Sequence, residues 1–499
     1  MGLLPLDVAP GLFLNRTRYS SKPRWVDGNL VRFRDGTVQQ VGGWQVLQAS
    51  GAGITGKARE ITGWRPNATS KRYVAIGSET GAWLYDGSNI RAITPDPFTV
   101  GTADTLSRIG YGTGAYGAGA YGVRRPDSSS TAEAVQWVFD LWGDLLLGCH
   151  TLDGTIYEFD VATGERMTPM VGAPRCDAIV VTDERHVFAL AASGNPSRVS
   201  WSDQENRNVW TPAATNKAGG YDLKTTGRIR CGRRARGQVL IWTDDELFAF
   251  YPVGLPFVYS YERVASSCGI AGPKAVAQVS DVAFWMGTDG FWLFDGAVRR
   301  IECDVHDHVF GDINLVQKVK FYAATNAIFD EVWFFYASAD SNEIDRCVSY
   351  NYRNNTWSRA DLARLCWLDR GVFPLPMAVT PSGAIFEHET GVASDGAVMA
   401  SYVESAPIEL GNGDRIQHVS ALWPDFRVGA GAIDVTLKGR FSPQGAEDLF
   451  GPYRLDSSTE QVFVAAAARQ LGVRIAAASP GDYWELGKMR VETRPGGFR

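Results

Sequence analysis

One short phrase recurs through most of the chain: a glycine-containing turn, then alternating apolar and other residues, then an acidic residue. Clear copies are ETGAWLYDG (79–87), LDGTIYEFD (152–160), TDGFWLFDG (288–296) and SGAIFEHE (382–389). Alternation with a period of two after a glycine turn is typical of the second arm of a β-hairpin. A chain built from such units is predicted to be all-β.

The copies of this phrase are spaced regularly. Looser copies lie at 197–203, 244–251 and 345–352. One strand position from each copy gives the series Trp83, Ile156, Val199, Leu247, Trp292, Val348 and Ile385. From Ile156 to Ile385 the mean spacing is about 46 residues, and a four-stranded propeller blade takes about 40–50. We therefore predict a β-propeller of six or seven blades over residues 51–404. The alternative, a stack of antiparallel sandwiches, would show no fixed period.

The first interval, from Trp83 to Ile156, is longer than the others. It contains YGTGAYGAGAYG (111–122), a five-residue unit repeated around Tyr111, Tyr116 and Tyr121. Glycines let the backbone turn sharply, and tyrosine rings lose few rotamers when they pack on a surface. The stretch predicts an insertion near 100–130 in one blade. It either packs on its own blade as an Ω-loop or contacts a neighbouring subunit or the lumen.

Both ends of the chain lack the blade phrase. Residues 405–499 alternate like strands, and VFVAAAARQLGVRIAAAS (462–479) predicts two strands rather than a helix, because of its β-branched residues and Gly472. This part is predicted to be a separate β-sandwich platform. Residues 1–50 contain Asp35-Gly36 between alternating arms, a β-hairpin signal. We expect this N-terminal segment to pack on the last blade or on the platform.

Composition narrows the class of protein. The chain has 54 glycines and 16 tryptophans, which fits many short strands joined by tight turns. Lys and Arg total 49 against 55 Asp and Glu, a net charge of −6, so a tight DNA-coating protein is not expected. The seven cysteines are scattered without a CxxC pair, as in a reduced cytoplasmic product. The sequence shows neither a signal peptide nor an apolar run long enough to insert stably in a membrane.

Several short motifs match nucleotide-binding, metal-binding or catalytic patterns, but the residues around them do not support such a site. The GxGxxG strings within 111–122 precede VRRPDSSS, not the helix that a dinucleotide site needs. Cys303, His306 and His308 are close in sequence, but on a strand only the two histidines would share a face, which leaves two ligands. No nucleophile motif accompanies the six histidines. We therefore predict no catalytic, cofactor-binding or metal-binding residues, and no enzyme.

The densest basic cluster is RIRCGRRAR (228–236). Arginine forks pair well with carboxylates and phosphates, so this cluster is a candidate subunit interface or lumen contact, although a solvated face is the common explanation. The candidate interface or lumen residues are thus Tyr111, Tyr116, Tyr121, Arg228, Arg230, Arg233, Arg234 and Arg236.

Several stretches together resemble the tail nozzle, or tail tubular protein B, of short-tailed bacteriophages and its propeller-like relatives that plug the portal and stabilise packaged DNA. They are RWVDGNLVRFRDGTVQQVGGWQ (24–45), the glycine-tyrosine stretch, DVHDHVFGDIN (304–314), EVWFFYASADSNEIDRCVSYNYRNNTWSR (331–359) and ELGNGDRIQHVSALWPDF (409–426). The likeness runs in order from about residue 10 to 495.

The resemblance implies a structural virion protein, located in the tail and assembled in the host cytoplasm. It implies a hexameric ring below the portal and adaptor, in contact with tail fibres or spikes. Double-stranded DNA would pass through it without sequence-specific binding, and an acidic lining suits such passage, because neutralised phosphates make DNA binding tight. Two other functions fit a propeller: a tail-associated glycan hydrolase with two carboxylates across the channel, or a carbohydrate-binding protein.

Overall fold

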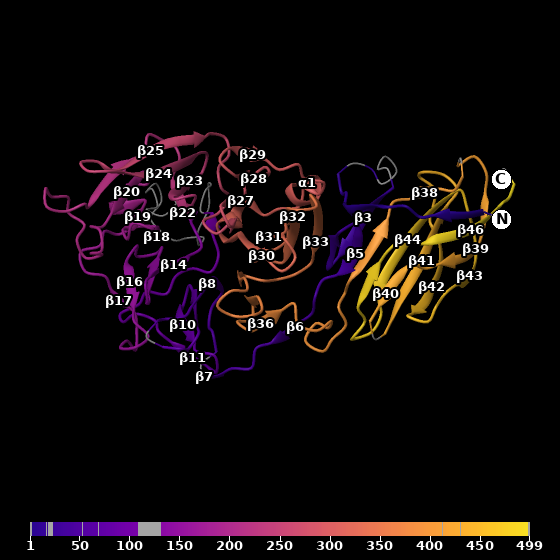
Figure 1. The fold of residues 1–499 in the computed structure, drawn as a ribbon, viewed down its shortest axis with the longest axis horizontal. Coiled ribbons are helices and arrows are strands. Elements are labelled where there is room, and N and C mark those ends of the chain that lie inside the picture. Colours follow the sequence, from indigo (N-terminus) through magenta and orange to yellow (C-terminus); the bar gives the residue numbers. More distant parts are fainter. Residues whose placement is uncertain are drawn as a thin grey trace, which may run out of the picture.

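The computed structural model describes residues 2–15, 17, 23–51, 53–67, 69–107, 131–411, 413–429 and 431–497. Within these ranges the chain is almost entirely β-structure, with one five-residue α-helix, α1 (His306–Phe310). Two 3₁₀ turns, η1 (Ala192–Gly194) and η2 (Leu315–Lys320), interrupt the strands. The strands form two lobes side by side, a ring of small sheets and a sandwich (Figure 1). No helix of the described ranges is long and apolar enough to cross a membrane.

The first lobe is a β-propeller, as predicted, and it has seven blades, within the predicted six or seven. Each blade contains four antiparallel strands, and blade 1 carries a short fifth strand at its outer edge. The innermost strands of blades 1 to 7 are β8 (Ala58–Trp64), β14 (Trp137–Trp142), β18 (Ala178–Val181), β22 (Ile229–Ala235), β26 (Val276–Val279), β30 (Tyr322–Asn326) and β34 (Cys366–Leu368). β34 packs beside β8, which closes the ring between blades 7 and 1.

The other strands follow outward in the same order. The second strands are β9 (Tyr73–Ser78), β15 (Leu145–His150), β19 (Val187–Leu190), β23 (Gln238–Thr243), β27 (Val282–Met286), β31 (Glu331–Tyr336) and β35 (Met377–Val379). The third are β10 (Gly81–Tyr85), β16 (Ile156–Phe159), β20 (Arg198–Trp201), β24 (Leu247–Gly254), β28 (Phe291–Phe294), β32 (Arg346–Asn351) and β36 (Ile385–His388). The outermost are β11 (Asn89–Ala92), β17 (Thr168–Pro169), β21 (Gly219–Asp222), β25 (Val258–Ala265), β29 (Val298–Arg300), β33 (Thr356–Ala360) and β6 (Trp44–Val46).

The repeated phrase of the sequence forms the third strand of each blade. All seven positions of the spacing series fall in the third strands, from Trp83 in β10 to Ile385 in β36. The apolar strand before each phrase is the second strand, and β9 and β31 are buried along their whole length. Middle strands lie between two neighbouring blades, so both of their faces must be apolar.

The last blade is completed by the beginning of the chain. β6 pairs antiparallel with β36, with Gln45 opposite Glu387. On the outside of blade 1, the short strand β7 (Ser50–Gly51) pairs parallel with β11. The propeller is therefore closed by hydrogen bonds between residues far apart in sequence.

The second lobe is the sandwich, and strands from both chain ends build it. One sheet has the order β1 (Gly2–Pro5), β46 (Arg490–Pro495), β39 (Gln417–Trp423) and β43 (Val462–Ala468). A second has the order β2 (Ala9–Leu12), β3 (Arg24–Asn29), β37 (Tyr402–Ser405), β44 (Gln470–Ala477), β41 (Ala432–Arg440) and β42 (Asp448–Asp456), with β38 (Ile408–Glu409) also on β44. A third has the order β4 (Val31–Arg34), β5 (Thr37–Gln40), β45 (Trp484–Leu486) and β40 (Phe426–Val428).

Two local predictions for these regions are confirmed. β4 and β5 are joined by Asp35 and Gly36, whose φ angles are +49° and +84°, so the Asp-Gly pair makes a two-residue hairpin turn. The alanine-rich stretch forms strands β43 and β44. The first fifty residues divide between the lobes, because β1–β5 belong to the platform and β6 to blade 7.

Candidate functional site in the propeller channel

All five arginines of the basic cluster lie on, or directly beside, β22, the innermost strand of blade 4. This strand has seven residues, and at about 3.3 Å per residue it runs along most of the length of the channel. Its two ends therefore emerge at opposite ends of the channel. We call the end with Arg233, Arg234 and Arg236 the wide mouth, and the end with Arg228 and Arg230 the narrow mouth.

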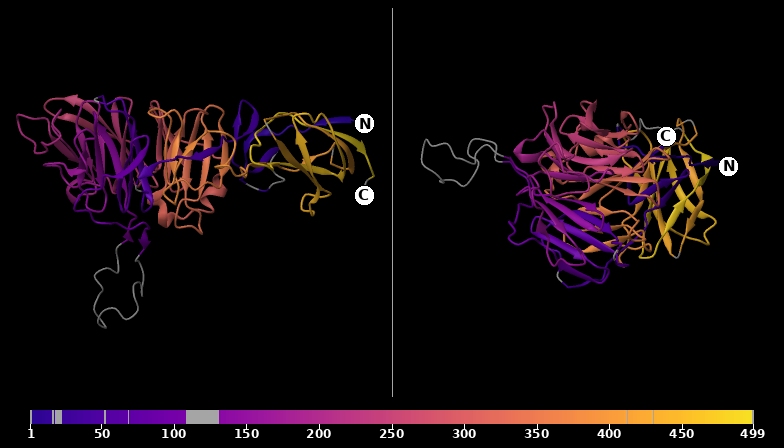
Figure 2. Two further views of the ribbon diagram at one scale, coloured as in Figure 1. Left: turned by 90° about the horizontal axis from the view of Figure 1, so that it is seen from below. Right: turned by 60° about the vertical axis from the view of Figure 1, so that its left-hand side comes forward.

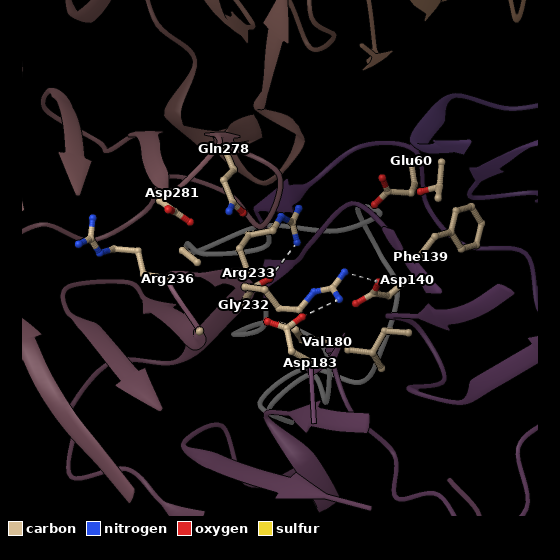
Figure 3. A pocket seen from close by; sticks show the side chains of 15 residues that line it. Glu60, Phe139, Asp140, Val180, Asp183, Gly232, Arg233, Arg236, Gln278 and Asp281 are labelled. Atoms are coloured by element: carbon tan, nitrogen blue, oxygen red, sulfur yellow. Dashed lines mark hydrogen bonds and ion pairs between the residues drawn. The ribbon is translucent and has the colours of Figure 1, made fainter. Parts of the chain in front are cut away.

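The wide mouth holds a cavity of about 540 Å³ (Figure 3). It lies where the inner strands end, since Asp183, Gly237 and Asp281 all follow such strands. Five blades contribute to its wall. The lining residues are Glu60, Thr62, Phe139, Asp140, Ile179, Val180, Asp183, residues 232–237, Gln278 and Asp281.

Arg234 holds two carboxylates at the rim of this cavity. Its guanidinium lies 3.4 Å from Asp183 and 3.8 Å from Asp140. Asp140 also accepts a hydrogen bond from the Val181 amide at 2.7 Å. Burial raises the pKa of Asp140, and the Arg234 charge acts against that shift.

Arg233 points into the cavity beside Gln278 (Figure 3). Its side chain is half-buried, and Nη1 donates to the Gly232 carbonyl at 3.0 Å. Arg236, at the rim, donates to the Asp295 carbonyl at 3.0 Å. Among the described residues, neither arginine forms an ion pair with a carboxylate.

A buried ion pair crosses the propeller channel. Lys274, which leads into blade 5, contacts the carboxylate of Glu60 on blade 1, and the two side chains are 3% and 7% exposed. Blades 1 and 5 are not neighbours in the ring, so this pair spans the channel. Burial lowers the pKa of Lys274, while contact with Glu60 favours the charged form. Glu60 of this pair also lines the cavity of the wide mouth.

The narrow mouth has a smaller cavity of about 310 Å³, lined by residues at or before the starts of inner strands and by the turn after β15. Arg228 pairs with Asp177 at 2.7 Å. Arg230 pairs with Asp244 at 2.6 Å and with Glu133 at 2.9 Å. Glu133 belongs to the base of the predicted insertion, so that insertion starts at the narrow mouth.

We define the insertion stem as residues 101–107 and 131–136. Within it, β12 (Leu106–Ser107) pairs with β13 (Thr131–Ala132). The Thr105 amide donates to Gln317 Oε1 at 2.9 Å, and Gln317 Nε2 donates back to the Thr105 carbonyl at 3.0 Å. Lys320 pairs with Asp104 at 2.5 Å. Contacts to blade 4 and to η2, before blade 6, thus fix the stem across the narrow mouth.

Tyr111, Tyr116 and Tyr121 lie outside the described residues, so their predicted contact with a subunit or the lumen stays a prediction. The five arginines line the channel of their own propeller, and their role at a subunit interface likewise stays a prediction.

The two histidines examined as possible metal ligands do not lie on a strand. His306 and His308 lie in α1, and the expectation of a shared strand face is wrong. Val305 and Val309, four residues apart and fully buried, favour a helical turn here. Within the described ranges, no group of three or more His, Cys, Asp or Glu residues could hold a metal ion.

Neither a family model nor a curated protein matches the chain. Solved structures do resemble it. The Cps50 (Swd1) β-propeller domain from Myceliophteria thermophila is 8% identical, with a TM-score of 0.40, and the match covers 70% of this chain and 99% of that one. Regucalcin from Agrobacterium tumefaciens, a calcium-binding protein, is 12% identical with a TM-score of 0.33, covering 52% and 90%.

An exo-β-1,3-galactanase from Phanerochaete chrysosporium is 12% identical, with a TM-score of 0.30, covering 91% of this chain and 100% of that one. At such identities the likenesses concern the fold alone. The prediction that this chain is not an enzyme is contradicted, because an exo-β-1,3-galactanase is among the structural neighbours of this fold. The likeness assigns no activity to this chain.

The sequence alone did not single out Glu60, Lys274, Gln278 or Asp281. They come from separate blades, and each is an ordinary polar residue in its own stretch. One signal was available for Lys274 and Glu60: each stands directly beside an apolar strand pattern, where a lone charge needs a partner.

Proposed function

We propose that this chain is a ring-forming structural protein of a phage tail, of the tail-nozzle kind. Six copies would surround a lumen below the portal and adaptor, through which double-stranded DNA leaves. The observation that carries this proposal is a pair of exposed apolar patches at opposite ends of the molecule. The resemblance of the sequence to tail nozzles supplies the virion context.

The first patch is the tip of the β24–β25 hairpin in blade 4, on the side of the propeller away from the platform (Figure 1). Val253, Leu255 and Phe257 are 47%, 69% and 66% exposed there. We call it the hairpin patch. Large apolar side chains gathered at a hairpin tip are typical of an interaction site.

The second feature is a pair of exposed apolar side chains on two neighbouring strands of the platform, which together we call the platform patch. Leu449 on β42 and Phe463 on β43 are 63% and 79% exposed. β42 and β43 are the last strands of their sheets and pack beside each other. Unpaired strand edges with apolar side chains favour association with another chain.

Two different patches at opposite ends support a head-to-tail contact between copies. Such heterologous contacts close into rings when the rotation between subunits allows it. Burying one large apolar side chain contributes about 1.5–3 kcal/mol, so four or five of them would hold a subunit in place.

The DNA path in this proposal is the axis of the ring and not the propeller channel. The Lys274–Glu60 pair crosses that channel, and the insertion stem lies over its narrow mouth. The net charge of −6 suits a lumen that DNA must slide through, because it limits phosphate neutralisation.

Paired variants test the head-to-tail contact. Leu255→Asp with Phe257→Asp removes the hairpin patch, and Leu449→Asp with Phe463→Asp removes the platform patch. We expect wild-type protein to form rings in electron micrographs and each double variant to stay monomeric. Mixed together, the two variants should form one-to-one heterodimers, since each keeps one intact patch. Native mass spectrometry reads all these states.

Val171→Asp is the matched control, because Val171 is 72% exposed but belongs to neither patch. It should assemble like wild type. A wild-type protein that stays monomeric at all concentrations, and in the presence of a portal–adaptor complex, would overturn the proposal.

A carbohydrate-directed function, binding or hydrolysis, is the second candidate. It is favoured by the polar wide mouth, where Asp140 and Asp183 face one cavity. Turnover of host polysaccharide, lost in Asp140→Asn and Asp183→Asn, would establish hydrolysis and displace the structural role as the main function.

A further inference from the structure

The wide mouth combines a rigid cavity with a cation that has no carboxylate partner among the described residues. We propose that it binds a small hydroxylated ligand with one oxyanionic group, an acidic sugar, and that Arg233 anchors that group. This inference is independent of ring formation and concerns a single subunit.

The cavity has the dimensions of a ligand site. Pockets for small molecules measure about 300–1,000 Å³, and the wide mouth measures about 540 Å³. Its walls are built on the innermost strands of five blades, and Glu60 in its lining is held by an ion pair with Lys274. A cavity built on packed strands is preformed, so a ligand loses little free energy by ordering it.

Among the charged residues of this cavity, Arg233 is the half-buried cation without an ion-pair partner in the described part of the chain. Asp140 and Asp183 share Arg234, and Glu60 contacts Lys274. Arg236 is exposed at the rim. Arg233 is half-buried, where a charge is screened less than in bulk water.

Most hydrogen-bond donors of the Arg233 guanidinium are not used by the protein residues described. Of its five N–H groups, the hydrogen bond to the Gly232 carbonyl uses one. The planar fork that remains matches a carboxylate or a phosphate, which it can bind through two parallel hydrogen bonds. The anionic part of the ligand therefore belongs at Arg233.

The other groups of the cavity favour a ligand with hydroxyl donors and disfavour a second acidic group. Asp281 is exposed in the cavity wall and has no ion pair among the described residues. Gln278 donates through Nε2 to the Ser280 carbonyl at 2.8 Å, which leaves its Oε1 as an acceptor. Carboxylates accept hydroxyl hydrogens and repel further anions, so a sugar with one acidic group fits better than a polyanion.

Isothermal titration calorimetry with four probes tests this site. Glucuronate and glucose 6-phosphate carry hydroxyls and an oxyanion, glucose lacks the oxyanion, and inorganic phosphate lacks the sugar. We expect glucuronate or glucose 6-phosphate to bind at least tenfold more tightly than glucose and inorganic phosphate. The two acidic probes distinguish a carboxylate ligand from a phosphate ligand.

Arg233→Gln should weaken the binding of the acidic sugar at least tenfold. Arg228→Gln is the matched control, since Arg228 flanks the same strand at the narrow mouth, and should leave binding unchanged. Gln278→Ala, which removes no charge, should weaken it severalfold and serves as a second variant if Arg233→Gln unfolds.

Three outcomes would overturn the proposal. The first is that neither acidic sugar binds. The second is that inorganic phosphate binds as tightly as glucose 6-phosphate, which would mean an oxyanion site without sugar recognition. The third is that folded Arg233→Gln protein, checked by its melting temperature, binds like wild type.

Discussion

At the scale of the residue, buried charges join the platform to the propeller. Arg32 on β4 contacts Glu331 of blade 6 at 3.1 Å and Glu389, just after blade 7, at 2.5 Å. The three side chains are 2%, 2% and 5% exposed. Asn326 Nδ2 and the Gly42 amide also donate to Glu389, at 2.8 Å and 3.1 Å. One cation thus serves two carboxylates, and the group is complete only when both lobes are in place.

Removing the cation should destabilise the protein strongly. Arg32→Met leaves two buried carboxylates without their partner, and breaking a buried ion pair in this way costs about 3–5 kcal/mol. We expect a loss of that size in the free energy of unfolding, measured by urea titration. The triple variant with Glu331→Gln and Glu389→Gln should recover much of it, because no buried charge then remains unpaired. An equally unstable triple variant would contradict this account.

Because two buried carboxylates share the single cation Arg32, the stability of the protein is expected to depend on pH. Burial raises the pKa of Glu331 above its ordinary value of 4.5, with Arg32 acting against the shift. The folded state therefore retains a proton that the unfolded state releases, so this contribution is fully present below pH 4.5 and is lost as pH rises toward the folded-state pKa. Over that interval Glu331→Gln should gain stability relative to wild type, by about 1.4 kcal/mol for each pH unit that separates the unfolded-state and folded-state pKa values. Parallel curves of unfolding free energy against pH for the two proteins would contradict it.

At the scale of the element, the repeats defined the third strands of the blades, because the hairpin pattern is local. Trp83 and its six equivalents all fall in such strands. The N-terminal segment was expected to pack on the last blade or on the platform, but the sequence did not identify β6 as the strand that pairs with β36, more than 300 residues away. The same limit applies to the site: the arginines of β22 stand together in sequence, whereas Lys274 and Glu60 meet only across the channel. Sequence alone could nominate Arg233 but not its surroundings.

The insertion stem should depend on Gln317. This side chain is 2% exposed, and its two hydrogen bonds satisfy the amide and carbonyl of Thr105. Gln317→Ala leaves both groups buried without partners, at about 1–3 kcal/mol each. Hydrogen exchange should speed up in the stem residues 101–107 and 131–136, while the blade strands keep their protection.

Val316→Ala is the control for the stem, because Val316 lies in the same 3₁₀ turn but is 52% exposed. Its exchange pattern should match that of wild type. If Gln317→Ala also leaves the stem unchanged, the other contacts, Arg230–Glu133 and Lys320–Asp104, hold it without Gln317.

At the scale of the whole molecule, the two lobes share one hydrophobic core. A single cluster of buried side chains runs from the platform, with Val403, Ile433 and Trp484, into blades 4 to 6, with Trp285 and Phe334. Blades 1 and 2 meet in a separate cluster. Figure 2 shows the platform beside the propeller in both further views. The platform is thus part of the packing of the propeller and not a domain attached by a linker.

A shared core predicts coupled unfolding of the two lobes. Trp484 is fully buried in the platform, and Trp484→Ala should cost about 3–5 kcal/mol. Because the cluster is continuous, hydrogen exchange should accelerate in the platform strands and in blades 5 and 6 together. Trp137→Ala, in the separate cluster of blades 1 and 2, is the matched control and should affect those blades first. If Trp484→Ala accelerated exchange in the platform alone, the two lobes would unfold independently. The buried contacts between them would then fix their relative orientation without coupling their unfolding.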